Sequence, residues 1–400
     1  MADPVVTDVG TSARKIDRED PNGGCPVVQG ADGVWRISGY AAGQAVLRSL
    51  ETKQAGLGID ASKAIPKRIR RPVLHSDGPE HRERRRLTAR FFTLRRVDEH
   101  YRELMHRVAD EQIDRLRRER SVDLSELSFA LAVEVAAAVI GLTNSRPGMA
   151  ARLERFAQGD LGPPNVTSIR GIRQFIRQNR HALAFYLADV RPAVRARRRR
   201  RTDDLISHMI DQGCTNAEIF AECVTFAPAG MITTREFINV AAWHLFTDDT
   251  LRARYHDADQ TERIAILHEF LRLEPVISTL KRRTTADIQL PGPHGPLTIP
   301  AGAQIDIAVS STNIDTQAIG ADPYTVRPAR PIGDGVSPAG LSFGDGPHKC
   351  PGAHVAIHET DIFLHKLFML DGLHMASPPQ VTLRDEIAAY ELRGLVVTLD

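Results

Sequence analysis

The chain has 400 residues, of which 42% are hydrophobic and 26% charged, and its formal net charge is +2. A nearly balanced charge disfavours a polycation that seeks nucleic acid, and this length suffices for one large hydrophobic core or two medium ones. The four cysteines, Cys25, Cys214, Cys223 and Cys350, form no CxxC pair. We therefore expect neither a disulfide framework nor a thiolate zinc site, and we expect a reducing compartment.

Residues 1–19 are polar and of mixed charge, without the apolar core of a signal peptide. No run of about 18 apolar residues occurs in the sequence, so no membrane span is predicted. These observations predict a soluble, cytoplasmic protein whose first 20 residues are flexible. No internal repeat divides the chain, and we expect residues 1–400 to form a single domain.

The predicted elements begin with a mixed segment of about 70 residues that has turn signals and few strand patterns. From Pro79 to Phe246 the periodicity is mainly helical, for example over Val122–Ile140. Residues 215–246 predict a helix of roughly nine turns. Because this helix is apolar on nearly all sides, we expect it to pass through the interior.

The pattern changes after Leu273. Residues 287–308 predict short strands with tight turns, and residues 313–342 are irregular and rich in Pro, Gly and Asp. A helix is predicted again over 353–370, and a strand over 394–399. The predicted fold class is mainly α with a small β region.

The segment 343–352 is a glycine-rich loop that places Cys350 directly before a predicted helix. Backbone N–H groups and the helix dipole favour an anion there, so we expect a thiolate, which suits an iron centre. Glycines at 344, 346 and 352 permit close approach of the backbone to a flat ligand. The alternative is that Cys350 is a buried cysteine with a packing role alone.

The sequence Phe343-Gly-Asp-Gly-Pro-His-Lys-Cys-Pro-Gly352 resembles the haem-binding loop of the cytochromes P450. The resemblance implies haem b as cofactor and Cys350 as the thiolate ligand of its iron. It implies that a long central helix covers the haem and that the cysteine loop lies beneath it. The implied cofactor-binding residues of the loop are Phe343 beside the sulfur, Gly344, His348 on a propionate, and Gly352, which with Gly346 lets the loop lie against the porphyrin.

Other segments match the same family in the same order, over roughly residues 77–394. Glu269-Phe-Leu-Arg272 resembles the family's ExxR pair, which implies a structural ion pair in the interior, whereas an isolated ExxR is usually a surface pair. Either Arg327 or Arg330 completes this network by resemblance. Glu359 matches a structural glutamate of the family.

Two further matches concern the haem propionates. Arg282 lies in a segment similar to the one that carries a propionate-binding arginine, and residues 77–86 are similar to the family's DPPxHxxxRR helix start. The resemblance implies that His81, Arg85 and Arg282 bind the propionates, because buried carboxylates need cationic or hydrogen-bonding partners.

Residues 229–234 resemble the segment that covers the oxygen side of the haem, which implies that Ala229 and Gly230 contact the cofactor. Thr233 matches the threonine that bends the helix and assists oxygen activation, and Pro228 is a second cause of a bend. The alternative for Thr233 is a hydroxyl that only binds its own backbone.

The sequence departs from the family pattern at Ile232, where an acid usually relays protons. Three possibilities stay open. Glu236 projects from the next turn, water together with Thr233 or Thr234 delivers protons, or the substrate assists. The predicted catalytic residues are Thr233, Thr234 and Glu236.

The sequence carries no fused flavin or iron–sulfur module, so electrons are expected from a separate protein such as a ferredoxin. By resemblance a basic set faces that partner: Arg82, Arg84, Arg86, Arg90 and Arg95. The run 197–201 is interpreted as a solvated helix end rather than a nucleic-acid site, because Asp203 and Asp204 follow it.

The substrate pocket implied by the resemblance includes Met231, Val276, Ile277, Thr279 and Tyr390. Two nearby segments are basic and suggest a substrate with an acidic or polar group: Lys63, Lys67, Arg68, Arg70, Arg71, Arg170, Arg173 and Arg177. Solvation of these side chains is an equally good interpretation.

We expect a monooxygenase that uses O2 to hydroxylate or epoxidise a small organic molecule in natural-product biosynthesis. Ile232 prompts an alternative, oxidative coupling or cyclisation without oxygen insertion. A third, weaker alternative is a non-catalytic P450-like binding module, against which the retained Cys350, Glu269, Arg272 and Thr233 argue.

Overall fold

A computed structural model of the protein describes residues 25–56, 70–157, 177, 179–292, 295–384 and 389–400. The chain divides into two compact units. The first comprises residues 1–57, 109–128 and 235–400, and the second comprises residues 58–108 and 129–234. Each unit therefore combines segments that are distant in sequence, and a single catalytic domain over 1–400 stays a prediction.

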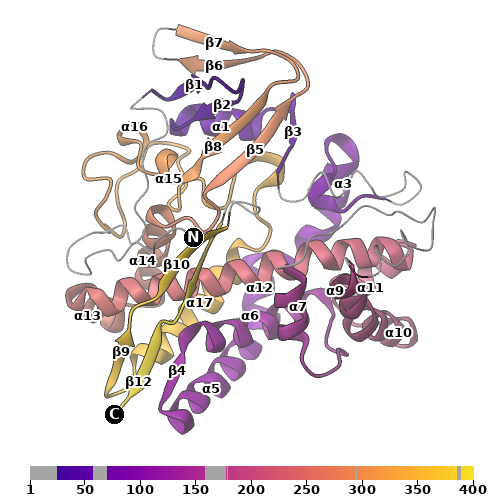
Figure 1. The fold of residues 1–400 in the computed structure, drawn as a ribbon, viewed down its shortest axis with the longest axis vertical. Coiled ribbons are helices and arrows are strands. Elements are labelled where there is room, and N and C mark those ends of the chain that lie inside the picture. The colour runs from indigo at the N-terminus through magenta and orange to yellow at the C-terminus, as the bar shows by residue number, and fades with distance from the viewer. Residues whose placement is uncertain (1–24, 57–69, 158–176, 178, 293–294, 385–388) are drawn as a thin grey trace. The chain divides into compact units, whose positions relative to one another are not determined.

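The main sheet of the first unit has five strands in the order β1-β2-β8-β5-β3. β2 runs parallel to β8, with Ile37 opposite Ile307, and β5 is antiparallel to both β8 and β3. The early strands therefore lie beside strands from the last third of the chain (Figure 1). The strands are β1 (Val27–Gln29), β2 (Trp35–Ile37), β3 (Thr52–Gln54), β5 (Thr279–Thr284) and β8 (Gln304–Ala308).

The expectation of a strand-poor N-terminal segment is wrong, because β1, β2 and β3 all lie there. Each of these strands has three residues, which is too short to display an alternation of apolar and polar positions. β2 pairs with β8 and β3 pairs with β5, so pairing over a long sequence separation forms these two strands, and β1 pairs with the neighbouring β2.

One hydrophobic core cluster of the first unit is formed by this sheet and α1 (Tyr40–Arg48). β8 alternates buried and half-buried positions, and Ile305 and Ile307 are fully buried. Val46 and Leu47 of α1 pack in the same cluster. The hairpin of β6 (Ile288–Gly292) and β7 (Gly295–Ile299) adds further apolar side chains, which confirms the strands predicted over 287–308.

Two helices of the first unit begin at side-chain caps. Asp248 caps α13 (Asp249–Asp257) by accepting from the Leu251 N–H, and Asp259 caps α14 (Gln260–Leu273) by accepting from the Glu262 N–H. α14 packs on α17. The remaining helices are α15 (Val309–Thr312), α16 (Thr316–Ile319), the 3₁₀ turn η5 (Gly346–His348) and α17 (Ala353–Phe368).

The C-terminal strands belong to the first unit as well. β12 pairs with both β9 and β4, and β10 pairs with β11. The predicted helix over 353–370 and the predicted strand over 394–399 are confirmed in type. The strands are β4 (Ser121–Asp123), β9 (Leu373–Ser377), β10 (Gln380–Arg384), β11 (Ala389–Arg393) and β12 (Val396–Leu399).

The described elements of the second unit are all helical. Its elements are η1 (Val73–His75), α3 (Gly78–Thr88), η2 (Ala89–Phe92), α4 (Leu94–Arg96), η3 (Val97–Tyr101), α7 (Met149–Ala157), α9 (Arg180–Phe185), η4 (Tyr186–Val190), α10 (Arg191–Arg199) and α11 (Leu205–Asp211). Three helices have residues in both units: α5 (Arg102–Glu119), α6 (Leu124–Ile140) and α12 (Asn216–Thr247).

α12 has 32 residues and confirms the long helix predicted over 215–246. Pro228 lies inside it, and residues 235–245 are buried. In the part of the chain that the structure describes, neither this helix nor any other is long and apolar enough to cross a membrane.

Candidate functional site

Cys350 lies at the end of a loop that folds back on itself before α17. The Cys350 N–H donates to the Phe343 carbonyl at 2.7 Å, and Gly344 and Gly346 have φ of +65° and +63°, values that favour glycine. The Cys350 side chain is exposed, Phe343 is half-buried, and α17 begins at Ala353. The loop therefore presents the thiol outward at the head of a helix, and the alternative of a buried packing cysteine is wrong.

The cysteine loop is braced by Asp345. One carboxylate oxygen accepts from the Gly346 N–H at 2.7 Å, and the other pairs with Arg48 Nε of α1 at 2.9 Å. A Cβ on Gly346 would overlap the Leu47 carbonyl oxygen and lie 2.9 Å from Arg48 Cα. Close contact with the end of α1 and the left-handed φ therefore explain glycine at 346.

Glu269 and Arg272 form a buried bidentate ion pair, with nitrogen–oxygen distances of 2.7 and 2.9 Å. Arg330 Nε lies 3.3 Å from the same carboxylate, whereas Arg327 reaches it through its backbone N–H at 2.9 Å. Arg272 also donates to the Asn313 and Pro323 carbonyls. Arg330 is therefore the side chain that completes the network, and the alternative of a surface pair is wrong.

The predicted propionate ligands fall on several elements. In the first unit, Arg282 is buried on β5 and donates a hydrogen bond to the Gln54 side chain of β3. His348, also in the first unit, is half-buried in η5. In the second unit, His81 is buried and Arg85 half-buried on α3. Because they are four residues apart on one helix, His81 and Arg85 share a face.

The predicted oxygen-side segment lies in the second unit. The Thr233 hydroxyl donates to the Ala229 carbonyl at 2.6 Å, a bond that bends helices. Ala229 is exposed and Gly230 half-buried, whereas Met231, Ile232 and Thr234 are buried. This bond is expected whether Thr233 assists oxygen activation or only binds its own backbone. The role of Thr233 in oxygen activation therefore stays a prediction.

Glu236 lies in the first unit and is fully buried. It accepts hydrogen bonds from the Arg235 and Arg393 side chains and from the Leu392 N–H. Burial raises the pKa of Glu236, and the two arginines oppose that shift. These contacts favour a structural role over the proton relay that we predicted.

Four of the five predicted pocket residues come together in the first unit. Ile277 forms an antiparallel bridge with Ala389, and the Tyr390 hydroxyl donates to the Glu274 carbonyl at 3.0 Å. Val276 is buried and Thr279 begins β5. Met231 belongs to the second unit.

The basic residues differ from expectation. Arg84 pairs with buried Glu222, Arg95 with Glu99 at 3.1 Å, and Arg90 with Asp203 at 3.8 Å. Within the predicted partner-facing set, Arg82, Arg86, Arg90 and Arg95 are exposed and Arg84 is half-buried. These acidic neighbours reduce the positive field that we expected there.

The run 197–201 is not simply a solvated helix end. Arg197 is buried and pairs with Asp204, and it also donates to Asn144 and Thr143 at 2.7 Å each. Asp204, one of the two acids that led us to expect a solvated helix end, is therefore the buried partner of Arg197.

Most of the basic side chains near the predicted substrate entrance lie outside the described residues: Lys63, Lys67, Arg68, Arg170 and Arg173. Arg70 donates its backbone N–H to Glu218 at 3.1 Å. Arg71 and Arg177 are exposed.

Comparison with known proteins identifies the family. The family model for cytochrome P450 matches residues 264–380, a span that includes Glu269, Arg272 and Cys350. Erythromycin C-12 hydroxylase of Saccharopolyspora erythraea is 31% identical over 367 residues, which cover 87% of this chain and 84% of the relative. The chain belongs to the cytochrome P450 family.

This cytochrome P450 is also 26% identical to pentalenic acid synthase of Streptomyces avermitilis over 369 residues, covering 86% of this chain and 83% of that enzyme. Among solved structures, P450BioI in complex with a fatty acid-ligated acyl carrier protein matches with a TM-score of 0.74 and 22% identity. That match covers 94% of this chain and 95% of the other. The fold is therefore the P450 fold.

Cytochromes P450 are haem b monooxygenases that use O2, an organic substrate and electrons from a redox partner. The cysteine loop of this P450 fits the haem, because an outward thiol at a helix N-terminus is a suitable iron ligand. The half-buried Phe343 and the left-handed glycine at 344 lie in the same loop.

Sequence reasoning missed two features of this P450. Asp345 before Gly-Pro carries an N-cap signal that we did not use, whereas nothing in the sequence marks Arg48 as its partner. Glu222, buried beside Arg84 and the Val73 N–H, was also missed, because a glutamate on an otherwise apolar helix has no distinguishing pattern.

Proposed function

We propose that the protein is a haem–thiolate monooxygenase that hydroxylates or epoxidises a small organic substrate in secondary metabolism, with Cys350 as the iron ligand. The observation that carries the proposal is the outward Cys350 thiol, held before α17 by the 2.7 Å bond to Phe343. The names of the related erythromycin C-12 hydroxylase and pentalenic acid synthase support a natural product as substrate.

The reaction consumes a substrate C–H bond, O2, two electrons and two protons, and yields the alcohol and water. Thiolate-ligated haem supplies the activation of O2. In our proposal Phe343 would lie beside the sulfur, and Gly344 and Gly352 belong to the loop that would lie against the porphyrin. Ala229 and Gly230 would lie on the oxygen side, and His81, Arg85, Arg282 and His348 would hold the propionates. Glu269 and Arg272 hold the surrounding fold through the network with Arg330.

Proton delivery is assigned to Thr233 and Thr234 together with water, because Ile232 cannot transfer a proton. The pairing of Glu236 with two arginines supports a positioning role for its carboxylate. Substrate assistance stays open, and a solvent isotope effect that depends on the substrate's own acidic group would favour it.

The proposed pocket comprises Met231, Val276, Ile277, Thr279 and Tyr390, and it takes a substrate with an acidic or polar group. Exposed Arg71 and Arg177 support that polarity. Spectral titration with an acid and its methyl ester tests it, and equal affinity for the two would contradict it.

The proposed electron donor is a ferredoxin that docks at exposed Arg82 and Arg86. The double variant Arg82→Gln/Arg86→Gln should raise the KM for a ferredoxin with little change in substrate affinity. The matched double variant Arg199→Gln/Arg200→Gln, which removes two exposed charges from α10 and the residue after it, should leave that KM unchanged.

The first experiment is the absorption spectrum of the reduced protein under carbon monoxide. A strongly red-shifted Soret band is expected for the wild type and for Cys214→Ser, and its loss is expected for Cys350→Ser. Cys214 is the control because it is also a free cysteine. A red-shifted band in Cys350→Ser would remove Cys350 from its assigned role.

Oxidative coupling or cyclisation is the second candidate, favoured by the buried Ile232 in place of an acid. Oxygen-18 from labelled O2 should appear in the product of a monooxygenase and be missing from a coupled product. A non-catalytic binding module would fail to consume reducing equivalents when substrate is added to haem-loaded protein.

A further inference from the structure

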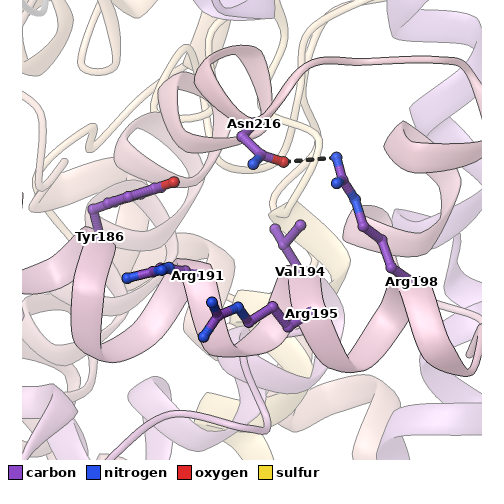
Figure 2. A pocket seen from close by; sticks show the side chains of 6 residues that line it. All are labelled: Tyr186, Arg191, Val194, Arg195, Arg198 and Asn216. Atoms are coloured by element: carbon purple, nitrogen blue, oxygen red, sulfur yellow. Dashed lines mark hydrogen bonds between the residues drawn. The ribbon is translucent and has the colours of Figure 1, made fainter.

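The second unit contains a pocket of about 360 Å³ whose charged lining is entirely basic (Figure 2). None of its lining residues belongs to the predicted haem or substrate residues. They are Tyr186, Arg191, Val194, Arg195, Arg198 and Asn216.

The three arginines come from α10 at spacings of four and three residues, so they share one face of that helix. Buried Val194 lies between them. Arg198 Nη2 donates to Asn216 Oδ1 at 2.8 Å, a bond that holds the third guanidinium against the first turn of α12 (Figure 2). The neutral amide orients this guanidinium and leaves its positive charge in place.

The charges of the pocket are not compensated within the described residues. Arg191 and Arg195 form no ion pair there, whereas Arg95 and Arg115 each pair with a glutamate four residues on, at 3.1 and 2.8 Å. On α10, by contrast, Arg191, Arg195 and Arg199 follow one another at intervals of four residues, so neighbouring side chains on this face repel each other.

The acids that flank α10 and the start of α12 are already engaged, and two of them, Asp203 and Asp204, pair with Arg96 and Arg197. Asp189 is fully buried and bound by Arg152 through two bonds of 2.7 and 2.8 Å. Glu218 accepts from the Thr215 N–H and from the Arg70 N–H. The concave basic surface therefore retains an excess of positive charge that an anion from outside the chain would neutralise.

We propose that this pocket binds a small molecule with a diphosphate or comparable polyanionic phosphate group. Guanidinium groups match phosphate oxygens through paired N–H donors, and three of them suit a ligand with more charge than one carboxylate. Tyr186 adds a hydroxyl at the wall of the pocket. The inference is independent of the haem chemistry proposed above.

The test is calorimetric titration of the haem-loaded protein with inorganic pyrophosphate at fixed ionic strength. The wild type should bind pyrophosphate, and Arg191→Gln/Arg195→Gln should weaken binding at least about tenfold. Arg199→Gln/Arg200→Gln removes the same charge from outside the pocket lining and should retain wild-type affinity. An unchanged carbon monoxide spectrum in both variants shows that each has folded.

The proposal is overturned if both double variants lose affinity equally, because pyrophosphate would then respond to net charge alone. It is also overturned if the heats for the wild type do not exceed those of sodium chloride at matched ionic strength. Should the Arg191→Gln/Arg195→Gln protein fail to fold, the single variant Arg195→Gln carries the test, with at least about threefold weaker binding expected.

Discussion

The fully buried Glu236 pairs with the half-buried Arg393, whose Nη1 lies 2.9 and 3.1 Å from the two carboxylate oxygens. The Leu392 N–H donates to the same carboxylate at 2.8 Å. Glu236 of α12 is thereby bound to β11, the strand that carries Tyr390. The carboxylate that sequence reasoning assigned to proton relay thus joins the central helix to the C-terminal sheet.

We therefore predict that Glu236→Gln chiefly lowers stability. Removing the charge leaves the buried Arg235 and the half-buried Arg393 beside a neutral amide, and breaking a typical buried pair costs about 3 kcal/mol. Urea unfolding measures it, with Glu119→Gln, which breaks a solvent-exposed pair with Arg115, as a control expected to cost much less. A folded, equally stable Glu236→Gln enzyme with an altered solvent isotope effect would instead restore the proton relay.

Arg330 and Arg327 provide a matched pair of variants. Arg330→Ala removes a buried side chain from the Glu269 network and should destabilise the protein by about 3 kcal/mol. Arg327→Ala keeps the backbone N–H that binds Glu269, so its effect should stay within about 0.5 kcal/mol. Unfolding midpoints and haem content after purification measure both. Equal losses in the two variants would show that the Arg327 side chain also belongs to the network.

Glu222 should make stability depend on pH. Burial raises the pKa of this carboxyl from 4.5 to about 7, although Arg84 acts to lower it. The folded state therefore holds its proton more tightly than the unfolded state, and the wild type loses stability as pH rises from about 4.5 to 7.

Glu222→Gln removes this pH dependence. Relative to the wild type, its stability should increase between pH 5 and pH 8 by an amount on the order of 3 kcal/mol. Urea midpoints at both pH values give the difference, with exposed Glu80, another neighbour of Arg84, substituted by Gln as the control. If the stability of Glu222→Gln relative to the wild type instead fell as pH rises, Arg84 would be the dominant influence and would hold the Glu222 carboxylate ionised.

Two glycines of the cysteine loop should respond differently to alanine. Gly346→Ala introduces a Cβ that overlaps the Leu47 carbonyl at a left-handed φ, so it should destabilise the loop by more than about 1 kcal/mol and reduce haem content. A Cβ at Gly352 meets no heavy atom of the described protein within 4 Å, so Gly352→Ala should leave unfolding unchanged. Haem loss in Gly352→Ala without loss of stability would support its place beside the porphyrin.

The sequence was sufficient for features that depend on local order. The cysteine loop, the long helix around Thr233 and the Glu269–Arg272 pair could all be predicted, because each is a short contiguous pattern. The choice of Arg330 over Arg327 could not, since both follow an irregular segment whose turns decide which side chain points inward. The short strands β2 and β3 escaped prediction for a related reason: their partners β8 and β5 lie far along the chain.

The contact between Arg48 and Asp345 spans 297 positions of sequence. During synthesis from the N-terminus, α1 therefore exists long before the cysteine loop that it braces. Closing so large a loop is slow compared with forming local helices. We expect haem to be captured late, after nearly the whole chain has emerged. Deletion of residues 1–49, which removes α1, should yield protein that folds in part and binds no haem.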